Sequence, residues 1–184
     1  MDAKELRKRL TRAQYILCIC EGAAEEDILN LLLDNDALIF SREQIIFDGI
    51  TRERKASVIT DRYLGAEFAE KIVVLRILDS KNENFKIKKP YNEKCEVINI
   101  NTNPEIEILF IIHKGKFNEY VRKYKSTTKP SEYCKRVLGV KGIKEQGFFK
   151  EYFTDDVKEL INILLDYRKL SQRESFLFLA DLLK

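Results

Sequence analysis

The sequence predicts an α/β protein in which a mostly parallel sheet is flanked by helices and followed by an all-helical C-terminal extension. Two observations lead to this fold class. In the first part of the chain, short apolar runs typical of buried strands alternate with segments of helical periodicity. From Pro104 to the C-terminus only helical patterns remain. The 184 residues correspond to a single domain, with the α/β core in 14–113 and the helical extension in 114–184.

The α/β core is justified element by element. Tyr15–Cys20 is a continuous apolar run closed by Glu21-Gly22, which is typical of a strand buried on both faces. The other expected strands are 44–47, closed by Asp48-Gly49, then 71–78 and 95–100. Helices are expected at 2–13 and 23–33, and a broken helix at 51–71. A loop is expected at 83–94, and a short strand at 85–88 within it is left open.

The C-terminal extension begins with a helix signal. Asn103 is a candidate cap, and Pro104 occupies the first helical position, where its missing N–H costs nothing. Helical patterns then cover 104–113, 116–125, 130–138, 145–152, 155–169 and 171–183. The apolar stretch 176–183 closes the core by default, and its alternative is an oligomer or partner surface.

Composition excludes several classes of protein. With 45% apolar and 34% charged residues, the chain is neither collagen-like nor disordered. No apolar run approaches the length of a membrane span, and Met1–Leu10 is typical of a charged helix rather than a secretory signal. The four cysteines lack zinc-site spacing, so we expect reduced, buried thiols in a cytoplasmic protein.

The charges are unevenly distributed. Cys20 to Asp36 contains six acids and no bases, whereas residues 114–150 contain eleven bases and three acids. In this basic segment aromatic residues alternate with the bases, as in proteins that bind nucleic acid. A polyanion partner is favoured over a solvated surface, although the aromatic residues are expected to face the core. The candidate phosphate contacts are Lys123, Lys125 and Lys129, with a smaller basic loop at Arg52, Arg54 and Lys55.

Two acids follow directly on the two most apolar strands. Glu21 and Asp79 are expected at the carboxyl edge of the sheet, where open α/β sheets bind ligands. Carboxylates of this kind suit Mg²⁺, Gly22 leaves room beside Glu21, and Glu25 overhangs the same place from the first helical turn. The equally weighted alternative is that the glutamates only favour the helix N-terminus.

A third acid lies in an apolar helix pattern. Glu107 is four residues after Asn103, so the two share a face in the expected helix, and a carboxylate there needs a partner or a metal. His113, the only histidine, falls on a different face. The favoured interpretation of His113 is a contact with the last carbonyls of the helix.

These motifs resemble a known family. The strand followed by Cys20-Glu-Gly-Ala-Ala-Glu25 is similar to the first motif of Toprim domains, and Leu78-Asp79 falls where those domains carry Asp-x-Asp. The stretch from Asn103-Pro104 through Glu107 to His113 resembles the Asn-Pro-x-Phe-Glu-x-Trp-x-x-x-His motif of RloB-like proteins, which are Toprim-related and encoded in bacterial restriction and phage-defence loci. The resemblance covers residues 14–113. Lys81 stands at the second Asp of Asp-x-Asp, and Leu109 stands at the tryptophan.

The resemblance implies a phosphodiester-cleaving centre that uses Mg²⁺ or Mn²⁺ in a nuclease of an anti-phage, abortive-infection system. Its catalytic residues would be Glu21, Asp79 and Glu107, and its metal ligands Glu21, Glu25, Asp79 and Glu83. Lys81 would bind phosphate. An AAA- or ABC-type ATPase partner is implied, and a homo-oligomer is possible.

Two other functions stay open. The first is a catalytically impaired Toprim-like module that binds nucleic acid or a partner protein without cleavage, because Lys81 replaces a metal ligand. The second is an enzyme that uses the same acids on a small phosphate ester or nucleotide.

Overall fold

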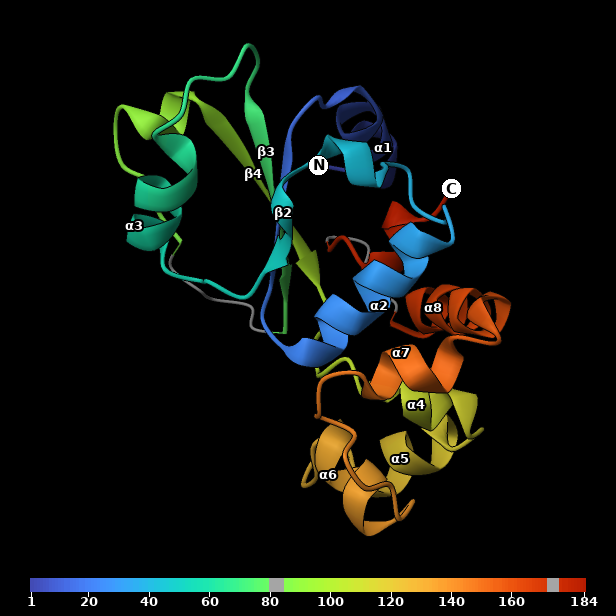
Figure 1. Cartoon of the computed structure of the whole chain (residues 1–184). Helices are drawn as coiled ribbons and strands as arrows, with labels where there is room; N and C mark the ends of the chain where they lie inside the picture. Colours follow the sequence, from blue (N-terminus) through green and yellow to red (C-terminus); the bar gives the residue numbers. More distant parts are fainter. Residues whose placement is uncertain (80–84, 172–175) are drawn as a thin grey trace.

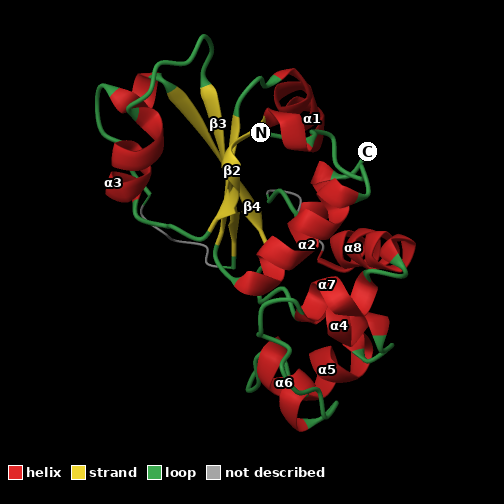
Figure 2. Ribbon diagram, in the orientation of Figure 1, coloured by secondary structure: helices red, strands yellow, loops and turns green. Residues whose placement is uncertain are grey.

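The computed structural model describes residues 1–79, 85–171 and 176–184. Its centre is a four-stranded sheet with the order β2-β1-β3-β4, in which every neighbouring pair is parallel. The strands are β1 Ile16–Cys20, β2 Ile45–Thr51, β3 Ile72–Leu78 and β4 Cys95–Asn101. The predicted α/β class, with a mostly parallel sheet flanked by helices, is confirmed (Figures 1 and 2).

The two faces of the sheet carry separate apolar clusters. Cys18 and Cys20 point into the larger cluster, whereas Leu17 and Ile19 point into the smaller one, as alternation along a strand requires. Because β1 is buried on both faces, its apolar run is continuous. β4 lies at the edge of the sheet and alternates instead, so that Val97 is 38% exposed.

Helices of very different lengths cover these faces. α1 Ala3–Arg12 and α2 Ala23–Asp34 pack on the side of the larger cluster. The short α3 Ala56–Ile59 and the π turn Thr60–Leu64 lie on the opposite side (Figure 1). The larger cluster continues into α4 Ile108–His113, α5 Phe117–Lys123, α6 Pro130–Arg136, α7 Phe148–Phe153 and α8 Val157–Ser171. The larger apolar cluster therefore joins the sheet to the C-terminal helices.

Two element predictions in the first hundred residues differ from the structure. β2 does not end at Asp48-Gly49 but continues through these residues to Thr51. Its pairing with β1 shifts register in this stretch, where Gly49 has a φ of 127°. The helix expected at 51–71 is reduced to α3 and its π turn. At the junction of the two, the Thr60 hydroxyl and the Thr60 N–H both donate to the Ala56 carbonyl. The expected loop is present in its described part, and residues 85–88 form no strand within it.

Two helix predictions in the C-terminal part are also wrong. α4 begins at Ile108 rather than at Pro104, because Asn103 and Glu105 bond to groups outside the helix. Of the last helix, expected at 171–183, residues 172–175 lie outside the described part of the chain. The described residues 176–183 contain a 3-10 turn at Leu179–Leu182, flanked by single bridges to β4 and to Leu38. Its apolar residues, including Phe178 and Leu182, are buried. Core closure, the default interpretation of this stretch, is confirmed.

All four cysteines are buried free thiols, as predicted. Burial raises the pKa of Cys18 to about 12, so its thiol stays protonated. No helix in the described ranges is long and apolar enough to cross a membrane.

Candidate functional site

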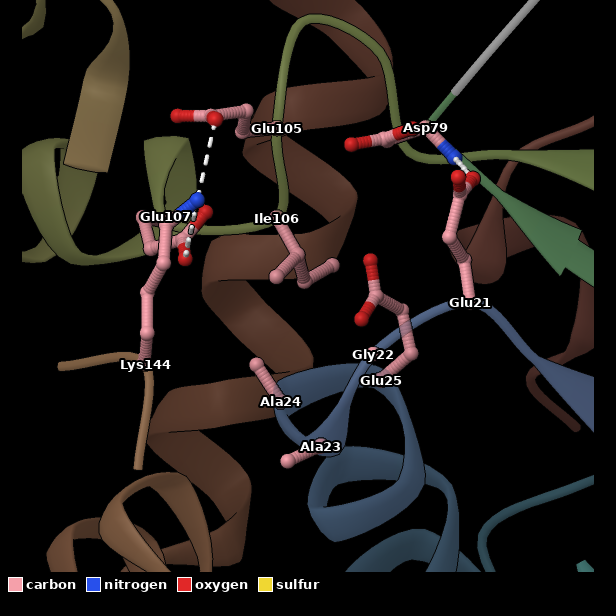
Figure 3. A pocket seen from close by; sticks show the side chains of 10 residues that line it. All are labelled: Glu21, Gly22, Ala23, Ala24, Glu25, Asp79, Glu105, Ile106, Glu107 and Lys144. Atoms are coloured by element: carbon pink, nitrogen blue, oxygen red, sulfur yellow. Dashed lines mark hydrogen bonds and ion pairs between the residues drawn. The ribbon is translucent and has the colours of Figure 1, made fainter. Parts of the chain in front are cut away.

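The carboxyl ends of β1 and β3 open into a pocket of about 180 Å³ that we call the acid pocket. It is lined by Glu21, Gly22, Ala23, Ala24, Glu25, Asp79, Glu105, Ile106, Glu107 and Lys144 (Figure 3). Five carboxylates from three separate segments of the chain thus surround one small space. Glu21, Glu25, Asp79 and Glu107, four of the predicted site residues, are brought together here.

Glu21 links the ends of the two central strands. Its Oε2 accepts a hydrogen bond of 2.9 Å from the backbone N–H of Asp79, and its other oxygen pairs with the Arg54 guanidinium. The side chain of Glu21 is 17% exposed, so the carboxylate is held at the pocket wall with limited contact to water. Arg54, predicted as a phosphate contact, therefore lies next to the acid pocket, where it pairs with Glu21.

Asp79 is the first residue after β3, and its carboxyl group points into the pocket (Figure 3). Burial raises its pKa to about 6, and the neighbouring carboxylates of Glu21 and Glu105 add to the effect. The side-chain amide of Asn103 donates a bond of 3.0 Å to the Asp79 carbonyl. Asn103 therefore fixes the backbone at the end of β3 rather than capping a helix.

Glu25 projects into the pocket from the first turn of α2. Only 5% of the residue is exposed, and the Thr102 hydroxyl donates to its Oε1 at 3.3 Å. Burial raises the pKa of Glu25 to about 7, and the charges of Glu107 and Asp79 act in the same direction. A Cβ at Gly22 would come within 2.8 Å of Glu25 Oε2, so a larger residue there would force this carboxylate to shift.

The far wall of the pocket is a charge cluster of two glutamates and one lysine. Lys144 Nζ lies 3.1 Å from Glu105 Oε1 and 3.9 Å from Glu107 Oε1, and the Ser131 N–H donates to Glu105 at 3.0 Å. Burial raises the pKa of Glu107. For Glu105, burial opposes ionisation, but the bonds from Ser131 and Lys144 outweigh it and lower the pKa.

Glu105 and Lys144 are site residues that sequence reasoning missed. Glu105 is only two residues from Glu107, and the same argument about a carboxylate in an apolar segment applies to it. Lys144 lies in a loop, and nothing in its local sequence separates it from the other lysines of the basic segment. The partner that Glu107 was predicted to need is this lysine.

Replacing Lys144 with Met is expected to destabilise the fold by roughly 1–2 kcal/mol, because it leaves two buried carboxylates without their cation. The figure is well below that for a fully buried pair, since the Lys144 side chain is 51% exposed and its interactions are screened. Urea unfolding at neutral pH measures the change. Lys141→Met, an exposed lysine of the same loop, is the matched control, and equal effects of the two variants would contradict the pairing.

The remaining predicted site residues lie elsewhere. His113 ends α4, as expected, but its ring contacts Glu159 at 3.3 Å and Tyr152 at 3.0 Å instead of helix carbonyls. Arg52 pairs with Glu26. Lys81 and Glu83 fall outside the described residues. Pro104 and Lys125 line a different pocket. Lys55, Lys123 and Lys129 are not among the described residues that line the acid pocket.

The aromatic residues of the basic segment mostly face inward. Tyr120, Tyr133 and Phe149 are buried, and Tyr120 and Tyr133 contact each other edge to face. Several of the bases also have acidic neighbours, such as Lys123 with Glu119 at 3.8 Å and Lys150 with Asp34 at 3.9 Å. Nucleobases cannot stack on these buried rings. Any contact of this segment with a nucleic acid would therefore come from its exposed lysines.

The donor set of the acid pocket suits a hard cation. It consists of carboxylate oxygens, and Mg²⁺ commonly binds through one or two carboxylates while keeping several waters. In the ranges that the structure describes, no group of three His, Cys, Asp or Glu side chains is arranged to hold a metal ion. A cation would therefore be held by one or two of these carboxylates and by water.

Comparisons with protein-family models, with curated proteins and with solved structures find no match to the chain. The functional argument therefore depends on the chemistry of the acid pocket.

Proposed function

We propose that the protein is a Mg²⁺- or Mn²⁺-dependent nuclease whose centre is the acid pocket. The observation that carries the proposal is the gathering of five carboxylates at the carboxyl edge of a parallel sheet, where such sheets bind ligands. The raised pKa values of Asp79 and Glu25 support it, because burial, helped by neighbouring carboxylates, perturbs titratable groups in this way at many functional sites.

Each side chain has a proposed role. Asp79 and Glu21 would hold the metal ion, which when bound supplies positive charge to the scissile phosphate. Arg54, on the outer side of Glu21, would contact a neighbouring phosphate. Glu25 has a pKa of about 7 and is suited to accept or release a proton near neutral pH. Lys144 would keep Glu105 and Glu107 in place and offset their charge.

The wider setting is part of the same proposal. The order of the motifs around Glu21, Asp79 and Glu107 supports a Toprim-like centre of the RloB-like kind, extended by the C-terminal helices. On that basis the protein would act in the cytoplasm in anti-phage defence, together with an AAA- or ABC-type ATPase. The four free thiols are consistent with a reducing compartment.

One observation favours a second candidate, a Toprim-like module that binds nucleic acid without cleaving it. Arg54 and Lys144 already neutralise carboxylates of the acid pocket, and no described group of three acids is arranged for a metal. In this alternative the two cations take the place of the metal ion.

Incubation of the purified chain with labelled single-stranded RNA, single-stranded DNA and duplex DNA distinguishes the two candidates. We expect cleavage of at least one substrate in the presence of Mg²⁺ or Mn²⁺ and none in EDTA. Binding without cleavage of any substrate under all metal conditions would contradict the nuclease and favour the binding module.

A further inference from the structure

A second hollow, of about 250 Å³, is lined by residues of α3, of its π turn and of 86–91. α3 lies on the side of the sheet that carries the smaller apolar cluster (Figure 1). We call the space the basic hollow, and the lining residues that concern us are Ser57, Thr60, Lys86, Lys88, Lys89 and Tyr91. Three lysines, a serine, a threonine and a tyrosine thus line a space of that size. The lining also includes one acid, Asp61.

The lysines are presented by a segment anchored to the core. Phe85 and Ile87 pack against the smaller apolar cluster, and the Arg76 guanidinium lies 3.9 Å from the centre of the Phe85 ring. Alternation along this extended segment turns Lys86 and Lys88 outward, where both are exposed. Their positions therefore depend on buried neighbours rather than on a free loop.

The positive charge of the basic hollow is not neutralised by the described part of the chain. Within residues 1–79, 85–171 and 176–184, no carboxylate forms an ion pair with Lys86, Lys88 or Lys89. In contrast, bases of the segment 114–150, such as Lys123 and Lys150, have acidic partners. With three lysines against one acid, Asp61, the lining of the hollow keeps a net positive charge that favours an anion.

The basic hollow and the acid pocket are connected by one short segment. Arg54 pairs with Glu21 at the acid pocket, and Ser57, three residues later, lines the basic hollow. Three residues of extended chain span at most about 11 Å, so only a short stretch of backbone separates the two sites. The side chain of Lys55, between the two sites, is exposed.

We infer that the basic hollow binds the phosphate backbone of a single-stranded nucleic acid and holds it a few nucleotides from the acid pocket. Tyr91 favours a single strand, because it is an aromatic residue that packs on the smaller apolar cluster, lies near Lys94 and stays partly exposed in the lining of the hollow, where an unpaired base can contact it. The inference rests on the proposed function and adds the path of the substrate, which leads from Lys86, Lys88 and Lys89 past Lys55 to Arg54.

The test is equilibrium binding of a labelled single strand of about 12 nucleotides, as RNA and as DNA, measured by fluorescence anisotropy in EDTA. Each phosphate contact to a single strand contributes about 0.7 to the salt slope. The triple variant Lys86→Gln, Lys88→Gln, Lys89→Gln is therefore expected to lower the slope by about 2 and to weaken binding on the order of 100-fold at about 0.1 M salt.

Two matched triple variants control for net charge. Lys4, Lys8 and Lys158 are exposed lysines on α1 and α8, and their replacement by Gln is expected to leave the slope nearly unchanged. Replacement of Lys123, Lys125 and Lys129 tests the basic segment as the competing surface. Thermal unfolding of each variant checks that the fold is intact. An unchanged affinity and slope in the Lys86, Lys88 and Lys89 variant, or an equal loss in the α1 and α8 variant, would overturn the inference.

The outcomes for binding and for cleavage are separable. Loss of binding in the triple variant without cleavage by the wild type would leave the basic hollow established and refute the nuclease. Metal-dependent cleavage by the wild type that is unaffected by the triple variant would refute the basic hollow and leave the nuclease intact. Binding that weakens equally for a duplex and for a single strand would refute the assignment to single strands.

Discussion

Glu21→Gln and Asp79→Asn are each expected to reduce metal-dependent cleavage by at least about 100-fold, the lower end of what a positioned acid or base contributes. Each substitution removes a charge that would hold the cation but keeps the shape of the side chain. Glu21 also accepts the backbone N–H of Asp79, and the amide oxygen of Gln can still do so, which limits the structural effect. Initial cleavage rates at saturating Mg²⁺ measure the loss.

The control for this pair of variants is Glu26→Gln. Glu26 is next to Glu25 in α2, but it pairs with Arg52 at 3.3 Å and does not line the acid pocket. Its replacement is expected to change the cleavage rate by less than about 3-fold, as for a residue outside the reacting centre. Full activity in both Glu21→Gln and Asp79→Asn would show that the acid pocket is not the centre.

The part of the site formed by strand ends was predictable from the sequence. Glu21 and Asp79 each follow an apolar strand directly, and parallel strands bring their carboxyl ends to one edge. Gly22 and Glu25 follow from the start of α2 in the same way. These positions depend on local pattern and on one topological rule, so no long-range contact had to be known.

The far wall of the acid pocket depends on contacts between distant parts of the chain. Ser131 and Lys144 bond to Glu105 although they lie 26 and 39 residues from it in the sequence. No local sequence pattern predicts either contact. The same contacts explain the error at α4. Asn103-Pro104 has the composition of a helix start, but the Asn103 amide bonds to Asp79 and delays the helix to Ile108.

The conformation of the C-terminal stretch, residues 176–183, also depends on contacts between distant parts of the chain. Residues 176–183 have the apolar content of a helix that packs on the core, and their burial follows from that content alone. Their conformation does not, because Phe178 pairs with Asn101 of β4 and Leu183 with Leu38, and these bridges hold the chain extended on both sides of the turn. Composition predicted where these residues lie but not the conformation they adopt.

Glu25→Gln is expected to make the metal-free protein more stable at high pH. In the folded state burial raises the pKa of Glu25 from 4.5 to about 7, so the folded protein keeps a proton that the unfolded chain releases. Between these two values the folded state binds more protons than the unfolded state, and stability falls as pH rises through this window. A shift of this size corresponds to about 3 kcal/mol lost by the wild type between pH 4.5 and pH 8. Asp79, with a pKa raised to about 6, adds a loss in the same direction.

The free energy of unfolding in urea, measured in EDTA at several pH values from 5 to 8, tests this expectation. The wild-type curve is expected to fall more steeply than that of Glu25→Gln, whereas Glu26→Gln should follow the wild type. Parallel curves for the wild type and Glu25→Gln would show that Glu25 does not hold a proton in the folded state. Addition of Mg²⁺ at pH 8 provides a second comparison, because a cation that binds only the folded state stabilises it. That stabilisation should be smaller in Glu25→Gln, since the negative charge of Glu25 that attracts the cation is then missing from the acid pocket.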